Sequence, residues 1–591
     1  MARNKYDVDE ELERGFNFQY LKRVFKYLVP YKKEMIFTLI IMLLSSVAGL
    51  TGPYLVKIAL DNQIPNKDVK GLIIVAVIFL LTQVINLVCL KIKIKKMNYV
   101  GQNVIFNLRK DLFEHLQKLP FTYYDSRPHG KILVRVVNYV NSLSDLLSTG
   151  IINLFTDTFS LFVIIGFMLV INVRLTIITL LGLPVLIFAT FLIKTAQRKA
   201  WQILSNKSSN LNAYIHESIC GMKVTQSFAR EKTNSEIFYN LNESYRKSWM
   251  RCVEIQFLMG PFVDNISSLV SAAIYILGIK WIGGSISVGV LVAFIGYIGR
   301  FWTPISNIAN TYNDIINGMA YLERIFETLD EEPTVKDIPN ASTMPEIKGD
   351  LEFKKVNFSY DEGHRILKDV SFKVPAGSSI ALVGPTGAGK TTIINLISRF
   401  YNIDDGAVLI DGTDISKVTL NSLRKQMGVM LQDSFIFSGT VMDNIRYGNL
   451  TASDDEVIAA AKIVRAHDFI KSLDNGYNTI VNERGTMFSA GQRQLIAFAR
   501  ALLANPAILI LDEATSSIDT NTEILLQQGL QELLKNRTSF IIAHRLSTIK
   551  NSTRIMYIDK GTIVEAGSHD ELMELKGEYY NLYQSQFKYL A

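Results

Sequence analysis

A glycine-rich stretch in the second half of the chain constrains the fold more than any other feature. The stretch reads Gly384-Pro385-Thr386-Gly387-Ala388-Gly389-Lys390-Thr391-Thr392. The apolar run Ile380–Val383 comes before it, and a run with helical spacing of apolar residues follows. This order of strand, glycine loop and helix has the spacing G-x-x-x-x-G-K-[ST] of a phosphate-binding loop. It predicts an α/β domain that binds a nucleoside triphosphate.

The residue types in this stretch suit a bound anion. Glycines allow successive backbone N–H groups to turn inward on a phosphate, and the helix N-terminus adds its positive dipole end. We expect Lys390 to reach the β- and γ-phosphates and the Thr391 hydroxyl to hold Mg²⁺. A glycine-rich turn that precedes a helix by chance is disfavoured, because the strand and the helix are both in place.

The composition predicts a membrane part joined to a water-soluble part. The chain has 591 residues, of which 48% are hydrophobic and 20% are charged. This length is too great for one hydrophobic core, and the apolar fraction is high for a soluble enzyme. The net charge of +7 does not indicate a nucleic-acid partner, because no dense basic tract is interleaved with aromatic residues. The three cysteines show neither a metal spacing nor a disulfide framework.

Six apolar stretches in the first half are each long enough to cross about 30 Å of hydrocarbon. They lie at Met35–Leu60, Leu72–Leu90, Ile151–Ile171, Leu175–Ile193, Leu258–Ile282 and Val288–Ile308. The links after the second and fourth stretches, 91–147 and 194–256, are long, helical in spacing and basic at their starts. The positive-inside rule therefore places both links and both termini in the cytoplasm. A basic amphipathic helix over Phe16–Tyr31 is expected to lie along the cytoplasmic membrane surface.

Four residues within these stretches are candidates for contact with cargo. They are Asp157, Asp264, Arg300 and Trp302. A charge at membrane depth is costly, so such groups usually face a bundle interior or a watery cavity. They could line a cargo cavity, or they could serve helix packing or lie near the interface, and the sequence leaves both possibilities open.

Beyond a polar, proline-containing linker over 328–349, strands and helices alternate. We expect strands at Leu351–Tyr360, Ser379–Val383, Ala407–Ile410, Ala507–Leu511 and Thr538–Ile542. The last two are continuous apolar runs, which are typical of a buried parallel sheet. The predicted fold is a multidomain membrane protein, with an all-α six-helix transmembrane domain over 1–327 and an α/β P-loop ATPase domain over 350–591.

Two strand ends in the second domain carry candidate catalytic residues. The apolar run Ile508–Leu511 ends in Asp512 and Glu513. We expect Asp512 to hold Mg²⁺ through water and Glu513 to polarise the attacking water. After a further strand, His544 could touch a γ-phosphate, although alone it would more often be an ordinary histidine at a strand end.

Between these features lies Phe488-Ser489-Ala490-Gly491-Gln492, followed by an expected helix over Arg493–Leu503. The assembled pattern resembles the ATP-binding cassette (ABC) transporters along nearly the whole chain. The five residues resemble the family signature, whose consensus is Leu-Ser-Gly-Gly-Gln. The same resemblance implies a Q-loop with Gln432 as a catalytic residue and Mg²⁺ ligand, a D-loop with Asp519, a switch histidine at His544 and an adenine-stacking aromatic at Tyr360.

The resemblance extends to the membrane half. Phe121–Asp125 and Gly221–Val224 resemble the two intracellular loops that bear coupling helices. The resemblance implies an exporter half-transporter that works as a dimer, with each ATP between the glycine loop of one cassette and the signature of the other. ATP and Mg²⁺ are the implied cofactors, and hydrophobic or amphipathic compounds, drug-like or lipid-like, are the implied cargo. We expect the chain in the cell membrane of a bacterium.

The signature departs from the consensus at Ala490, which stands in place of glycine, and at Phe488, which replaces leucine. A β-carbon at position 490 would crowd the backbone approach to a phosphate across the dimer interface. Within the family, an altered signature beside intact hydrolysis residues is typical of one half of a heterodimer, which we favour. The alternatives are a homodimeric lipid or peptide exporter and, less favoured because Glu513 is present, an ATP-gated switch or channel.

Overall fold

The computed structural model describes residues 18–125, 127, 129–145, 150–281, 286–360, 363–430, 434–512, 519–542 and 546–587. The chain divides into two compact units. The first contains the described residues up to Gln117 together with His129–Glu331, and the second contains the described part of 118–128 together with the chain from Glu332 onward.

The regular structure described in the first unit is predominantly helical. Its α-helices are α1 Phe18–Leu28, α2 Lys32–Ile58, α3 Val69–Leu116, α5 His129–Val134, α6 Val140–Asp145, α7 Ile151–Ile171, α8 Val173–Cys220, α9 Met222–Ser227, α10 Glu231–Trp281 and α11 Val288–Asp330. Six of the described helices are long and apolar enough to cross a membrane. They contain the described residues of the six predicted spans, and Ile282 at the end of the fifth span lies outside the described residues. Helices α3, α8 and α10 continue well beyond the spans, so the described parts of the long links are largely helical, as predicted.

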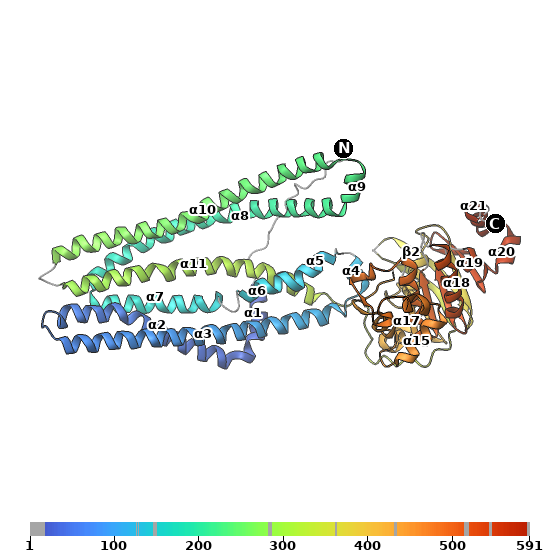
Figure 1. Ribbon diagram of the computed structural model, residues 1–591, viewed down its shortest axis with the longest axis horizontal. Coiled ribbons are helices and arrows are strands. Elements are labelled where there is room, and N and C mark those ends of the chain that lie inside the picture. The colour runs from blue at the N-terminus through green and yellow to red at the C-terminus, as the bar shows by residue number, and fades with distance from the viewer. Residues whose placement is uncertain are drawn as a thin grey trace. The chain divides into compact units, whose positions relative to one another are not determined.

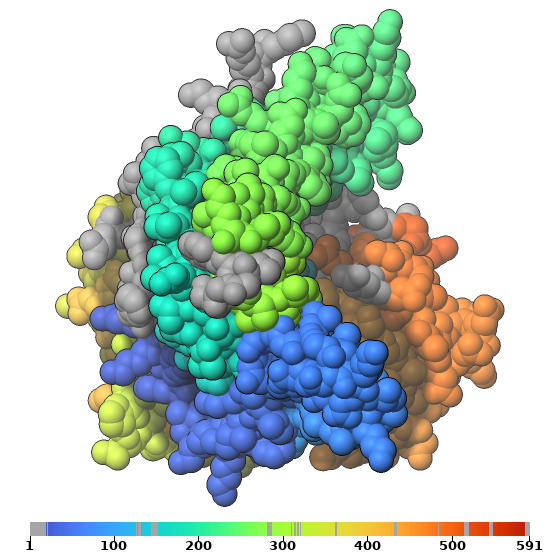
Figure 2. Space-filling view, turned by 90° about the vertical axis from the view of Figure 1, so that its left-hand side faces the viewer, coloured from blue at the N-terminus to red at the C-terminus, as the bar shows by residue number. Residues whose placement is uncertain are grey.

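The helices of this unit pack in neighbouring antiparallel pairs. In Figure 1, α2 runs beside α3, and α8 runs beside α10. Figure 2 shows one end of the unit, where α2 and α3 (blue), α7 and α8 (teal) and α10 and α11 (green) form distinct areas of the surface. Large apolar side chains face outward on α3, where Leu80 and Leu87 are 63% and 66% exposed. Such continuous apolar exposure is stable only against lipid or another protein surface.

Aromatic residues of α11 form the centre of the first unit. Phe294, Tyr297 and Phe301 are fully buried. The Tyr297 ring stacks on Phe167 of α7 with the ring centres 5.8 Å apart, and its hydroxyl donates to the carbonyl oxygen of Leu50 in α2 at 2.9 Å. This hydrogen bond satisfies a buried hydroxyl and joins three of the apolar helices.

Two element ends differ from the sequence-based expectation. The predicted amphipathic helix is α1 followed by a short 3₁₀ turn over Val29–Tyr31, and Phe16 lies outside the described residues. Helix α11 continues to Asp330, into the segment expected as linker. There the Arg23 guanidinium of α1 donates to the Asp330 carboxylate at 2.7 Å and lies over the Phe326 ring, which fixes the end of α11 against α1.

The described residues of the second unit form two main sheets and a short antiparallel pair, β7 with β8. A four-stranded antiparallel sheet has the order β2-β1-β4-β5, and a six-stranded sheet has the order β12-β11-β3-β10-β9-β6. The strands are β1 Leu351–Ser359, β2 Arg365–Val374, β3 Ser379–Val383, β4 Asp405–Ile410, β5 Thr413–Asp414, β6 Met427–Met430, β7 Gly439–Thr440, β8 Ile480–Val481, β9 Ile508–Asp512, β10 Thr538–Ile542, β11 Arg554–Asp559 and β12 Thr562–Gly567. In the larger sheet, β11, β3, β10, β9 and β6 are parallel, as the continuous apolar runs predict.

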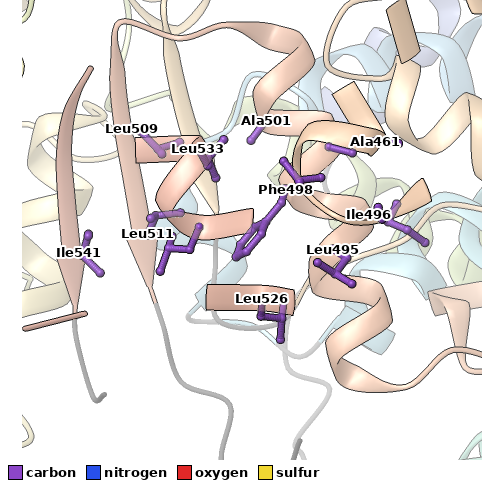
Figure 3. Close-up of a cluster of buried hydrophobic side chains, with 14 of the residues drawn as sticks. Ala461, Leu495, Ile496, Phe498, Ala501, Leu509, Leu511, Leu526, Leu533 and Ile541 are labelled. Atoms are coloured by element: carbon purple, nitrogen blue, oxygen red, sulfur yellow. The ribbon is translucent and has the colours of Figure 1, made fainter. Parts of the chain in front are cut away.

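Helices α12, α13, α17 and α20 contact strands of the larger sheet. The α-helices of this unit are α12 Lys390–Ile397, α13 Leu420–Arg424, α14 Val441–Arg446, α15 Asp454–Ile463, α16 His467–Lys471, α17 Ala490–Ala504, α18 Thr520–Leu534, α19 Leu546–Lys550, α20 His569–Leu575 and α21 Glu578–Phe587, and α4 Phe121–Asp125 belongs to the same unit. Figure 3 shows Phe498 of α17 pointing toward Leu511 of β9 and Leu526 of α18. This packing fixes α17 against the parallel sheet.

The turn that follows β3 requires glycine at its first position. Gly384 has a φ of +141°, and a β-carbon there would lie 2.1 Å from the carbonyl oxygen of Ile558 in the neighbouring strand β11. Gly387 has a φ of +81° but open space around it, with nothing within 4 Å of a β-carbon. The two glycines therefore differ in steric freedom while both have positive φ.

Gly384→Ala should destabilise the second unit more than Gly387→Ala. Positive φ costs about 1–2 kcal/mol for alanine at Gly387. At Gly384 the backbone strain adds to a clash with a strand carbonyl oxygen, so the free energy of unfolding should fall by about 2–5 kcal/mol. Differential scanning calorimetry of the purified full chain measures both variants. Equal losses of unfolding temperature would contradict this steric account.

Candidate functional site

The glycine loop lies at the edge where the parallel strands end. It connects β3 to α12, and β10 pairs on one side with β3 and on the other with β9. Ile542 is in register with both Leu382 and Asp512, so these strand ends lie side by side. The carboxyl ends of parallel strands are where α/β sheets bind ligands.

Three of the predicted catalytic residues lie outside the described residues. They are Gln432, Glu513 and His544. In the sequence they follow within two residues of the last described positions of β6, β9 and β10, which are Met430, Asp512 and Ile542. Because β6, β9 and β10 are parallel to β3, all three strands end on the side of the sheet where the glycine loop lies.

Lys390 is buried within the glycine loop. Its side chain is at the start of α12, and its ammonium group donates to the carbonyl oxygens of Gly384 at 2.7 Å and Pro385 at 2.9 Å. Burial lowers the pKa of Lys390 below its ordinary value, and the negative charge of Asp512 partly offsets this effect. A phosphate oxygen beside the ammonium group would favour its charged form, because a nearby anion raises the pKa of a cation.

The hydroxyl groups that follow Lys390 face different surroundings. Thr391 is exposed at the loop, whereas Thr392 is buried and its hydroxyl lies 3.2 Å from the Tyr360 hydroxyl. The Tyr360 ring is 41% exposed and stands edge-on to Phe358 and Tyr401, with ring centres 4.9 Å and 5.1 Å apart. An aromatic ring with part of its surface open can stack on a planar base.

Mg²⁺ would be held by few protein groups in such a site. No cluster of three or more His, Cys, Asp or Glu suited to a metal is present among the described residues. Asp512 is half-buried at the end of β9, and Thr391 offers its hydroxyl at the loop. These two oxygen groups fit Mg²⁺, which is commonly bound by one or two protein groups together with water and substrate phosphates.

The signature-like residues form the start of a helix. Ser489 is the N-cap of α17: its hydroxyl accepts from the Gln492 backbone N–H at 3.2 Å, and the Gln492 side chain accepts from the Ser489 backbone N–H at 3.0 Å. Helix α17 therefore begins at Ala490 and not at Arg493 as expected, because this capping box adds a turn that the apolar spacing does not mark. Gly491 is buried in the same turn.

The two substituted signature positions have different surroundings. Phe488 is buried in the hydrophobic core beside Phe469, with ring centres 6.4 Å apart. Ala490 is half-buried in the first turn of α17 and has helical backbone geometry, which alanine adopts without strain. The methyl group of Ala490 therefore causes no backbone strain in α17, and any effect it has must come from what the side chain contacts.

Asp519 also caps a helix. Its carboxylate accepts from the Thr522 backbone N–H at 2.9 Å at the start of α18, and hydrogen bonds from Thr522 lower the pKa of this carboxyl group. Residues 516–518 of the expected D-loop lie outside the described residues.

The four intramembrane candidates have different hydrogen-bond partners or packing surroundings. The Asp157 carboxylate of α7 accepts from the Asn307 amide of α11 at 3.5 Å, while Lys93 of α3 donates to Asn153 at 3.2 Å. Arg300 donates to the carbonyl oxygen of Gly49 in α2. These contacts join separate helices within the first unit.

The two remaining candidates have contrasting exposure. Asp264 of α10 is exposed, and its backbone carbonyl accepts from Ser268. Trp302 is only 3% exposed and packs among the buried side chains of the first unit. Its burial favours a packing role for the ring.

Sequence reasoning missed two features of these surroundings. Lys93 is one of the basic residues at the start of the link 91–147, where charge marks only topology, yet it lies in the polar group that contains Asn153 and Asp157. The Tyr401 hydroxyl donates a hydrogen bond to the Asp125 carboxylate of α4 at 2.6 Å. No spacing marks this pair, since 276 positions separate the two residues in the sequence.

Comparison with known proteins places the chain in a family. Residues 35–305 match the family described as the ABC transporter transmembrane region, and residues 367–516 match the family described as ABC transporter. The ABC transporter ATP-binding protein YknV of Bacillus subtilis (strain 168) is 44% identical over 590 residues, which cover 99% of this chain and 98% of the relative. The ATP-dependent lipid A-core flippase of Syntrophus aciditrophicus (strain SB) is 34% identical over 589 residues, which cover 100% of this chain and 98% of the relative.

A solved structure shows the same architecture. The structure of a bacterial Atm1-family ABC exporter with ATP bound superposes with a TM-score of 0.81 at 30% identity, covering 94% of this chain and 98% of that one. The six apolar helices and the bacterial relatives indicate a multi-pass plasma-membrane protein. The chain is an ABC transporter of the exporter type, in which one transmembrane region and one ATP-hydrolysing domain coupled to transport are fused in a single polypeptide.

Proposed function

We propose that this chain exports hydrophobic or amphipathic compounds from a bacterial cell by alternating access, as half of a dimer. The observation that carries the proposal is the buried Lys390 inside the glycine loop, at the sheet edge that also bears Asp512. The first unit supplies six helices with outward apolar faces. The relative named as a lipid A-core flippase supports a lipid-like cargo.

The proposed ATP site takes its groups from the glycine loop and the neighbouring strand ends. The loop N–H groups and Lys390 would bind the phosphates, and Tyr360 would stack on the adenine. Thr391, Asp512 and Gln432 would hold Mg²⁺, which supplies charge neutralisation on the phosphates when bound. Glu513 would accept a proton from the attacking water, and His544 would contact the γ-phosphate.

The signature would complete the nucleotide site of a second chain. The N–H groups at the start of α17 and the Ser489 hydroxyl are suited to a γ-phosphate that arrives from outside this chain. Ala490 would place a methyl group at that contact, so this chain's signature would complete a weak site. We therefore favour a heterodimer whose partner carries a consensus signature and lacks a catalytic glutamate. Both termini would lie in the cytoplasm.

Cargo would contact polar groups within the membrane helices. Asp157 with Asn307, Arg300 near α2, and the exposed Asp264 are the proposed contacts. A polar group at membrane depth usually faces the bundle interior or a cavity, where it can meet the polar part of an amphipathic compound. Trp302 would contribute mainly to packing.

Replacing Ala490 by glycine should increase ATP hydrolysis by the chain purified alone in lipid. The wild-type chain should turn over slowly, because two copies can offer only altered signatures. Removing the methyl group should raise turnover about tenfold, which corresponds to about 1.4 kcal/mol of barrier. Ala490→Val should lower turnover further. Robust wild-type turnover that neither variant changes would show a homodimer that tolerates the methyl group.

Glu513→Gln should abolish phosphate release in the Ala490→Gly chain. Loss of a general base costs about 10²–10⁴-fold in rate. ATP binding should persist, because glutamine keeps the side-chain volume. Glu574→Gln, on the exposed face of α20, serves as the matched control and should retain full turnover. Turnover that survives in Glu513→Gln would exclude this residue as the base.

A further inference from the structure

Helix α4 packs against the rest of the second unit through a short series of side chains. The Tyr401 hydroxyl donates to the Asp125 carboxylate at 2.6 Å, which is the distance of a strong, charge-assisted hydrogen bond. Four residues earlier in the same helix, the Phe121 ring packs against Phe400 with ring centres 4.6 Å apart. Phe400 and Tyr401, which are adjacent in the sequence and follow α12, therefore contact both ends of the one-turn helix α4.

The other side of Tyr401 faces the expected base-binding ring. Tyr401 is 8% exposed, and its ring stands edge-on to Tyr360 at 5.1 Å between centres, with 87° between the planes. Phe358 packs against both rings, at 4.9 Å from Tyr360 and 5.8 Å from Tyr401. Tyr360 in turn lies within hydrogen-bond distance of Thr392 in α12. A continuous set of contacts thus runs from α4 to the glycine-loop helix.

The chemistry of Tyr401 suits a fixed contact. Burial and the hydrogen bond to Asp125 raise the pKa of the Tyr401 hydroxyl, so it keeps its proton and remains the donor. Because the three rings are closely packed, Tyr360 cannot rotate far without displacing Tyr401. A planar base stacked on Tyr360 would hold that ring in place and would thereby hold Tyr401 and its bond to α4.

We propose that Tyr401 is a positioning residue that couples the base-binding Tyr360 to helix α4 of the same chain. The inference rests on the proposed function, because it requires adenine to stack on Tyr360. The contact through Tyr401 makes α4 sensitive to the base of the nucleotide as well as to its phosphates. The alternative is that Tyr401 only fills space between α4 and the sheet.

Binding of ATP and of inorganic tripolyphosphate separates these two possibilities. Tyr401→Phe keeps the ring and removes the hydroxyl, and Asp125→Ala removes the acceptor. Each should weaken ATP binding about three- to tenfold, as expected for one lost hydrogen bond, and leave tripolyphosphate binding unchanged. The double variant should weaken ATP binding no more than either single one. Asp125→Asn retains an acceptor oxygen and should bind ATP nearly as the wild type does.

Hydrogen exchange of α4 tests the coupling directly in the full chain. ATP should slow amide exchange over residues 118–125 in the wild type, whereas tripolyphosphate should not. Tyr401→Phe should remove the ATP effect. Unchanged ATP binding and exchange in Tyr401→Phe and Asp125→Ala, or equal weakening of both probes, would overturn the inference in favour of simple packing. A wild-type chain that binds neither probe would overturn the proposed function, and the inference with it.

Discussion

The parallel pairing of β3, β10 and β9 is the constraint on which the nucleotide site depends. Because Ile542 is in register with Leu382 and Asp512, the loop after β3 and the carboxylate at the end of β9 belong to one edge. The strands are buried on both faces, so a slip in register would disrupt the packing of their side chains and separate these groups. The chemistry of the site thus follows from hydrogen-bond register inside a hydrophobic sheet.

Burial also prepares the loop for its ligand. Lys390 is enclosed and donates to two carbonyl oxygens of its own loop. Its pKa is lowered by that burial, so an arriving anion gains more from the contact than it would beside an exposed lysine. The positive φ of Gly384 keeps the loop close to β11, where a side chain would clash with the carbonyl oxygen of Ile558.

Local and periodic features of the structure could be predicted from the sequence, whereas contacts between distant segments could not. The six apolar helices and the strands at Ser379–Val383 and Thr538–Ile542 follow from length, hydropathy and β-branched runs. The added turn of α17 depends on a capping box, and the bond from Tyr401 to Asp125 joins segments far apart in the chain. Helical spacing could not distinguish the buried Trp302 from a cavity-facing side chain, because its burial depends on how neighbouring helices pack.

Binding of ATP to the purified full chain, with Lys390→Ala as the variant, tests the central claim most directly. The wild type should bind ATP saturably in the presence of Mg²⁺. The variant should bind at least about tenfold more weakly, because it loses a buried charge-assisted contact to phosphate. Lys417→Ala, an exposed lysine in the same unit, should bind as the wild type does. Equal affinity of the wild type and Lys390→Ala would contradict a nucleotide site built on this loop.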